Sequence, residues 1–124
     1  MVAVYLAIFG LLGVFSRYYF ARIIHKYFSI SFPIDIFTIN VVGAFVIGIV
    51  YVLAIEKSQI NHELRIGLMV GFLGGFTTFS SYCLDTFKLF NSGKILQCFL
   101  YFSLSPILGM LFTFLGIYLA RKFS

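Results

Sequence analysis

Residues Gly71–Tyr82 read GFLGGFTTFSSY and interrupt a stretch of chain that hydropathy otherwise assigns to a membrane-spanning helix. Glycine is about 1 kcal/mol less favourable than alanine in a helix interior. Adjacent Gly74 and Gly75, followed by two β-branched threonines, therefore predict a break at mid-span. Lipid cannot satisfy free amide and carbonyl groups, so backbone of this kind must be buried in protein or line a wet cavity. An ion or solute pathway is the first hypothesis.

The composition around this stretch excludes a soluble globular domain. Of 124 residues, 61% are hydrophobic and 10% are charged, and the mean hydropathy is +1.05. Apolar segments near the roughly 20 residues needed to cross hydrocarbon recur along the chain. They predict an all-α integral membrane protein with one four-span domain over residues 1–124, with a broken third helix and spans at about 2–25, 34–55, 64–88 and 95–121.

Basic residues are balanced between the two ends of this four-span arrangement. An excess of Lys and Arg normally marks the cytoplasmic side. With Arg17 set aside as intramembrane, each end carries four, namely Lys57, Arg65, Arg121 and Lys122 against Arg22, Lys26, Lys88 and Lys94. The balance predicts dual topology and an antiparallel dimer, unless one loop is assigned to the wrong side. Because these residues lie singly at helix ends and form no patch, nucleic acid is not expected as a partner.

Polar groups inside the spans are candidate site residues, because burying them in lipid is unfavourable. Arg17 lies four residues after Gly13 and either supports the bundle interior or snorkels to the headgroups. Asn40 begins a face of small residues that continues with Gly43 and Gly48. Its amide either bonds across helices or points into a pathway, where it would replace part of an anion's hydration. The sequence leaves both pairs of alternatives open.

The fourth span carries a polar stripe with a proline beside it. Tyr101, Ser105, Gly109 and Thr113 recur every four residues, so they share one helix face. The stripe either lines a pathway or bonds back to its own carbonyl groups. Proline has no N–H, so Pro106 frees the carbonyl four residues earlier and predicts a bend or a hydrated spot beside Ser105.

Two aromatic residues follow the predicted break on one helix face. Phe79 and Tyr82 are three residues apart, and such pairs usually serve packing. A ring edge is positive, however, so it can attract an anion weakly, and weak binding suits rapid passage. The break also leaves the carbonyl groups of Gly74 and Thr77 without helical partners, which suits sodium or ordered water.

Taken together, these motifs resemble the Fluc (CrcB-type) fluoride channels along nearly the whole chain. The resemblance rests on the spacing of Gly10, Gly13, Arg17 and Tyr18, on Asn40-x-x-Gly-Ala-Phe-x-x-Gly48, on Gly71-x-x-Gly-Gly-x-Thr-Thr-Phe-Ser, and on the pair Tyr101 and Ser105.

This resemblance implies an antiparallel dual-topology dimer with two parallel fluoride pores, each lined by both subunits. Asn40 and the ring edge of Phe79 would touch the ion, Tyr82 would take the second aromatic position, and Arg17 would support the fold and orient Asn40. A structural sodium ion would lie on the dimer axis, held by the backbone carbonyls of Gly74 and Thr77. The remaining fluoride-pathway residues would be the polar track of Tyr101, Ser105 and Thr113.

The resemblance also implies passive export of fluoride from the cytoplasm of a prokaryote through its plasma membrane, the inner one if there are two. Acid brings fluoride in as HF, and the membrane potential drives the anion out, which relieves toxicity. Members of the family usually have other residues at Phe9, at Asp35-Ile36, at Ser81 and at Tyr82. Since some members work only as heterodimers, the partner is either a second copy or a paralogous subunit.

A proton-coupled small multidrug exporter is the nearest rival class, since it is also a four-span antiparallel dimer. Such exchange needs a membrane-embedded carboxylate. Here Asp35, Glu56, Glu63 and Asp85 are all expected at helix ends or in loops. An enzyme is not expected either, because no nucleophile has a His or carboxylate partner nearby in sequence.

Overall fold

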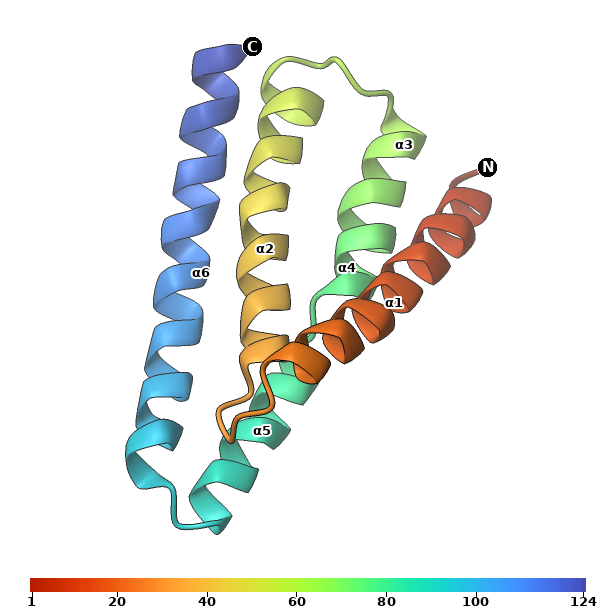
Figure 1. Ribbon diagram of the computed structural model, residues 1–124. Helices are drawn as coiled ribbons and strands as arrows, with labels where there is room; N and C mark the ends of the chain where they lie inside the picture. The colour runs from red at the N-terminus through yellow and green to blue at the C-terminus, as the bar shows by residue number, and fades with distance from the viewer.

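A computed structural model describes all of residues 1–124, and its regular structure is entirely helical (Figure 1). Four helical segments are long and apolar enough to cross a membrane, so the chain is a multi-pass membrane protein, as predicted. The elements in chain order are α1 (Val2–Tyr27), α2 (Ile34–Tyr51), η1 (Val52–Glu56), α3 (His62–Ile66), η2 (Gly67–Phe72), α4 (Leu73–Phe76), α5 (Phe79–Asn91) and α6 (Ile95–Phe123).

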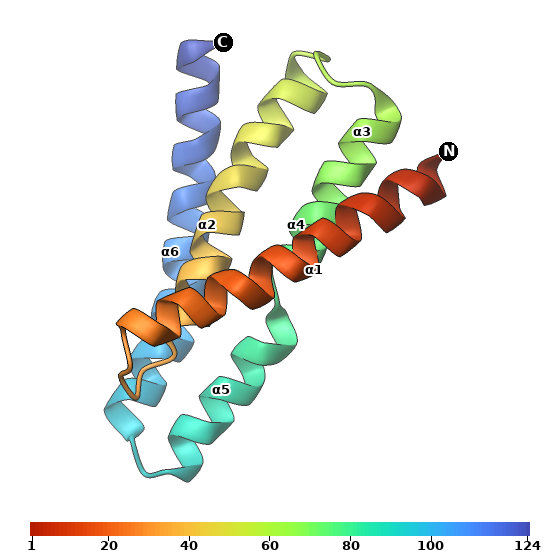
Figure 2. The same ribbon diagram turned by 45° about the vertical axis from the view of Figure 1, so that its right-hand side comes forward.

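The spans form two pairs. In Figure 1, α2 and α6 run side by side in the same direction, while α1 lies obliquely across α4. Figure 2 shows this oblique crossing from another side. Both termini and the loop between η1 and α3 lie at one end of the molecule, and the other two loops lie at the opposite end. The basic residues at the two ends are therefore separated as the sequence analysis assigned them.

Glycines allow the paired helices to touch backbone to backbone. A Cβ added at Gly48 would overlap the carbonyl oxygen of Thr113 across the α2–α6 contact. One added at Gly13 would overlap the carbonyl oxygen of Phe72 across the contact between α1 and η2. Small residues of this kind are the usual means of close helix packing in lipid. The bundle therefore depends on specific glycines more than on large apolar side chains.

The third span is broken, as predicted, but the break lies at the threonines and not at the glycines. Gly74 and Gly75 remain helical in α4, whereas Thr77 (φ −85°, ψ 158°) and Thr78 (φ −150°, ψ 119°) are extended. Gly75 serves close packing instead, since a Cβ there would lie 2.8 Å from the carbonyl oxygen of Gly10. The helix restarts at Phe79, where the Thr78 hydroxyl accepts a hydrogen bond from the Ser81 amide (3.2 Å).

Candidate ion pathway

A groove of about 460 Å³ lies at the break, between α2, the third span and α6. It brings together residues that are far apart in the sequence and were candidates for the site. Its lining includes Asn40, Gly74, Thr77, Phe79, Tyr82 and Ser105, with Gly43, Ala44, Ile47, Met69, Leu73, Thr78, Pro106 and Gly109. Tyr101 and Thr113 are absent from this lining.

Asn40 binds both the backbone amide and the backbone carbonyl group of Thr78, at the break in the third span. Its Nδ2 donates to the Thr78 carbonyl oxygen (3.0 Å), and its Oδ1 accepts from the Thr78 amide (2.8 Å). Of the two alternatives for the Asn40 side chain, the bond across helices is thus present. An asparagine amide has two N–H groups, so one donor of Asn40 remains for the groove that it lines. Thr78 was not among the predicted site residues, although threonine is a favoured residue at a helix N-cap.

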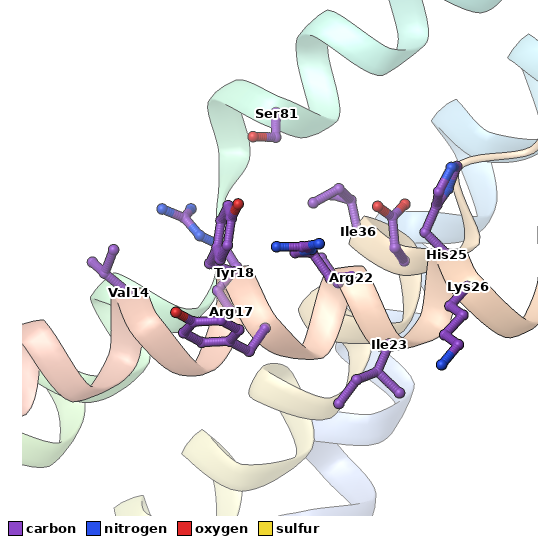
Figure 3. A pocket seen from close by; sticks show the side chains of 12 residues that line it. Val14, Arg17, Tyr18, Arg22, Ile23, His25, Lys26, Ile36 and Ser81 are labelled. Carbon is purple, nitrogen blue, oxygen red and sulfur yellow. The ribbon is translucent and has the colours of Figure 1, made fainter.

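Arg17 lies in a different cavity from Asn40. This second cavity, of about 980 Å³, is lined from α1 by Arg17, Arg22 and Lys26 and from α5 by Ser81. Figure 3 shows Tyr18 and Arg22 on the side of α1 that faces Ser81, whereas Ile23 and Lys26 point away from it. Thr78 holds both polar atoms of Asn40, and Arg17 forms no hydrogen bond to that side chain. The expected orientation of Asn40 by Arg17 is therefore replaced by orientation through the backbone of Thr78.

The two aromatic residues after the break meet in the groove. The ring centroids of Phe79 and Tyr82 are 5.8 Å apart, and Phe79 is 77% exposed in the single chain. Behind Tyr82 lies the fully buried ring of Tyr101, with centroids 5.3 Å apart. The Tyr101 hydroxyl lies 3.4 Å from Oδ2 of Asp85. Tyr101 therefore backs the aromatic pair and does not line the groove.

Along α6, only part of the predicted polar stripe opens to the groove. The hydroxyl oxygen of Ser105 is buried without a hydrogen-bond partner and belongs to a groove-lining residue. Thr113 is used for packing, because its hydroxyl oxygen lies 2.9 Å from the Ala44 carbonyl oxygen and 3.0 Å from that of Gly109. Buried polar groups normally have a partner. Ser105 thus has an unused donor buried beside the groove.

The carbonyl groups of Gly74 and Thr77 have both lost their helical donors. In a continuous helix the Thr78 amide would donate to Gly74, but it donates to Asn40. The Ser81 amide would donate to Thr77, but it donates to the Thr78 hydroxyl. No group of three His, Cys, Asp or Glu side chains could hold a metal ion. A hard cation would therefore have to use carbonyl oxygens of this kind, so the residues fit the sodium ion that the resemblance implies.

Asp85 is not at a helix end or in a loop, contrary to the expectation from the sequence. It lies in the middle of α5, because this helix continues to Asn91. Its side chain lines a small third cavity together with Lys88 and Lys94, near the loop between α5 and α6. The chain therefore has a carboxylate within a span, although it is outside the groove.

Comparison with known proteins identifies the family. Residues 4–117 match the family described as CrcB-like protein, Camphor Resistance (CrcB). The "Fluoride-specific ion channel FluC" of Geotalea uraniireducens is 40% identical over 117 residues, which is 94% of each chain. The proteins of the same name from Aquifex aeolicus and Trichormus variabilis are 36% identical over 116 residues (94% of each chain) and 41% identical over 110 residues (88% of this chain, 80% of the relative). The resemblance inferred from the motifs is thereby confirmed, and the chain belongs to the CrcB-like (FluC) family of membrane proteins.

Proposed function

We propose that this chain forms a fluoride-selective channel that passively exports fluoride from the cytoplasm and so relieves fluoride toxicity. The observation that carries the proposal is the groove at the break, which joins the Asn40 amide, the rings of Phe79 and Tyr82 and the hydroxyl of Ser105. The ion itself is taken from the names of the relatives. The organisms of those relatives support a prokaryotic plasma membrane, the inner one if there are two.

The groups along the groove suit an anion that must leave as readily as it enters. The free N–H of Asn40 can replace part of the hydration shell of fluoride, and the unpartnered hydroxyl of Ser105 lies buried beside the groove, where a side-chain rotation would bring it to the ion. The ring edges of Phe79 and Tyr82 add weak attraction without a fixed positive charge. No Lys or Arg lines the groove. Several weak contacts in series favour conduction over tight binding.

A second copy of the chain would cover the groove. Free backbone groups at membrane depth are tolerated only when they are buried in protein or line a wet cavity. A Cβ added at Gly74 would meet nothing within 4 Å, so this side of the break is open in the single chain. The balance of basic residues supports an antiparallel arrangement, and each pathway would then be lined by both copies. Active C-terminal fusions of both a cytoplasmic and a periplasmic reporter would support dual topology, and activity of only one would contradict it.

A sodium ion on the dimer axis follows from the same arrangement. Two copies would supply four carbonyl oxygens, from Gly74 and Thr77 of each, which is a better shell for a cation than two. A ligand that binds only the folded state stabilises it by about 2.7 kcal/mol at 100 times its dissociation constant. Sodium should therefore raise the thermal stability of the purified protein at constant ionic strength, whereas equal stability in sodium, potassium and choline would contradict the site.

Proton-coupled export of the multidrug type is weakened by the position of Asp85. This carboxylate is within a span, but it lines the cavity near the α5–α6 loop with Lys88 and Lys94. It is absent from the groove at the break. A coupled exporter needs its carboxylate where substrate binds, so the channel is favoured.

Fluoride efflux from liposomes tests the proposal directly. Purified chain is reconstituted into vesicles loaded with potassium fluoride, valinomycin is added, and a fluoride electrode follows release beside a matched chloride experiment. Rapid fluoride release without chloride release is expected. Release that requires an imposed proton gradient would indicate coupled exchange. Silence toward both ions would contradict a homodimeric channel, and co-expression with a paralogous subunit would then test an obligate heterodimer.

A further inference from the structure

A proline inside α6 leaves one backbone carbonyl without its helical donor. The helix runs from Ile95 to Phe123 without interruption and contains Pro106. Proline has no N–H, so the carbonyl oxygen of Phe102, four residues earlier, cannot accept the usual bond. At membrane depth such an oxygen needs another donor, because lipid provides none.

The hydroxyl of Tyr82 supplies that donor from a different helix. It donates to the Phe102 carbonyl oxygen at 2.6 Å, within the usual range for an O–H···O bond. Tyr82 lies one turn past the break, in α5, so this bond joins the start of α5 to the proline position of α6. A phenylalanine could not form it. The bond occupies the site beside Ser105 where the sequence predicted a bend or a hydrated spot.

The same bond determines which groups of Tyr82 can contact an ion in the groove. A tyrosine has one O–H donor, and here the Phe102 carbonyl takes it. The ring is also in contact with those of Phe79 and Tyr101, at centroid distances of 5.8 and 5.3 Å. Toward the groove, Tyr82 therefore presents an aromatic ring whose hydroxyl is already engaged.

We propose that Tyr82 and Pro106 form a coupled positioning pair, in which the tyrosine hydroxyl replaces the amide that the proline lacks. The bond holds the Tyr82 ring in the groove so that only its weakly positive edge meets the ion. This inference rests on the proposed channel function. A free hydroxyl at this position would donate to the anion strongly and slow its exit, so the pairing favours rapid conduction.

A double-mutant cycle tests the pair. Wild type, Tyr82→Phe, Pro106→Ala and the double variant are reconstituted, and two quantities are measured. The fraction of vesicles that release fluoride reports how many channels are folded and active, and the rate from those vesicles reports conduction. Tyr82→Phe alone should lower the rate about tenfold without lowering the fraction, an effect of the size expected from one lost hydrogen bond.

In the Pro106→Ala background the same change should not lower the rate and should raise it if anything, because the alanine amide satisfies Phe102 and the freed Tyr82 hydroxyl is the group that Tyr82→Phe removes. Pro106→Ser supplies the same amide if the alanine variant is not obtained in folded form. Tyr118→Phe is a matched control, since Tyr118 is an exposed tyrosine of α6 outside the groove. Its rate and fraction should equal those of wild type.

Each other outcome has a distinct meaning. Equal losses in both backgrounds would overturn the pairing and indicate that the hydroxyl acts on the ion itself. A fall in the active fraction at an unchanged rate would reduce the bond to a structural role. No loss in either background would also overturn the inference. If wild type releases no fluoride either alone or with a paralogous subunit, the proposed function fails and this inference fails with it, whereas conduction without coupling refutes the pair alone.

Discussion

The two parts of the third span on either side of the break differ in how the chain surrounds them. The packed half, Gly67–Phe76, has four buried residues, Gly67, Gly71, Leu73 and Phe76. The open half, Phe79–Asn91, is longer and has only Leu89 buried. A segment buried by its own subunit contributes to folding, whereas an exposed one is free to meet another surface. We infer that the packed half sets stability and the open half sets conduction.

Glycines explain why the packed half fits so closely against α1. A Cβ at Gly67 would lie 2.9 Å from the ring of Phe9, and one at Gly71 would lie 3.2 Å from the Gly10 amide. The absence of a side chain at Gly67 makes room for the ring of Phe9. The open half has no glycine.

Asn40→Asp should lower fluoride efflux more than any other substitution, because Asn40 binds the chain where the two halves of the third span meet. A carboxylate cannot donate to the Thr78 carbonyl oxygen as Nδ2 does, and it adds a negative charge to the groove. Bringing like charges together is unfavourable by several kcal/mol, so fluoride efflux should fall at least about a hundredfold. The measurement is the rate per active vesicle.

The matched control makes the same chemical change outside the groove. Asn61→Asp keeps the oxygen that accepts from the Leu64 amide (2.8 Å), so efflux should remain at the wild-type level. Wild-type efflux in Asn40→Asp would remove this residue from the pathway. Equal loss in both variants would mean that the effect is not local to the groove.

Phe79→Ile tests the open half alone. The change removes the ring edge from the groove while keeping an apolar side chain, so efflux should fall about fivefold or more, the effect of losing an attraction of about 1 kcal/mol or more. Phe87→Ile is the control, because Phe87 is also exposed on α5 but does not line the groove. Similar rates for the two variants would argue against a role for the ring. Neither change should affect stability as much as a change in the packed half.

The sequence predicted what depends on local composition, and missed what depends on contacts between helices. Hydropathy was sufficient to predict four spans, and the glycines and threonines of the third span were sufficient to predict that it is broken. The exact place of the break within the predicted stretch of two glycines and two threonines was not predicted, because Gly74 and Gly75 stay helical while Thr78 is extended and bonded to Asn40. That bond joins residues 38 positions apart, so no local pattern reveals it.

The candidate site shows the same division. Spacing on α6 predicted one polar stripe, but Thr113 bonds to the carbonyl of Ala44, while Ser105 keeps a free hydroxyl. Which member of a stripe remains free depends on the neighbouring helix, and a single sequence does not contain that information. The freed carbonyl of Phe102 could be predicted from Pro106, but its donor, Tyr82, could not.

Gly13→Ala tests the packed half. Its new Cβ would overlap the backbone of Phe72, and backbone cannot move aside as a flexible side chain does. Overpacking of this kind typically lowers the free energy of unfolding by about 1–3 kcal/mol, which the midpoint of thermal unfolding in detergent can report. Gly10→Ala is the control on the same helix, since its Cβ would meet only the Gly71 carbonyl oxygen at 4.0 Å. Equal stability of the two variants would contradict the close packing of this half.

Asn61→Ala should have the smallest effect, and it is the clearest test of whether the packed half sets stability without setting conduction. The Asn61 side chain caps the helix that leads into the packed half, and loss of such a cap lowers stability by about 1 kcal/mol. The residue is exposed, so water can satisfy part of the freed amide. Stability should therefore fall slightly while the fluoride rate per active vesicle stays at the wild-type value. A lower rate at unchanged stability would mean that the start of the packed half also controls conduction, and the division of roles between the two halves would then have to be abandoned.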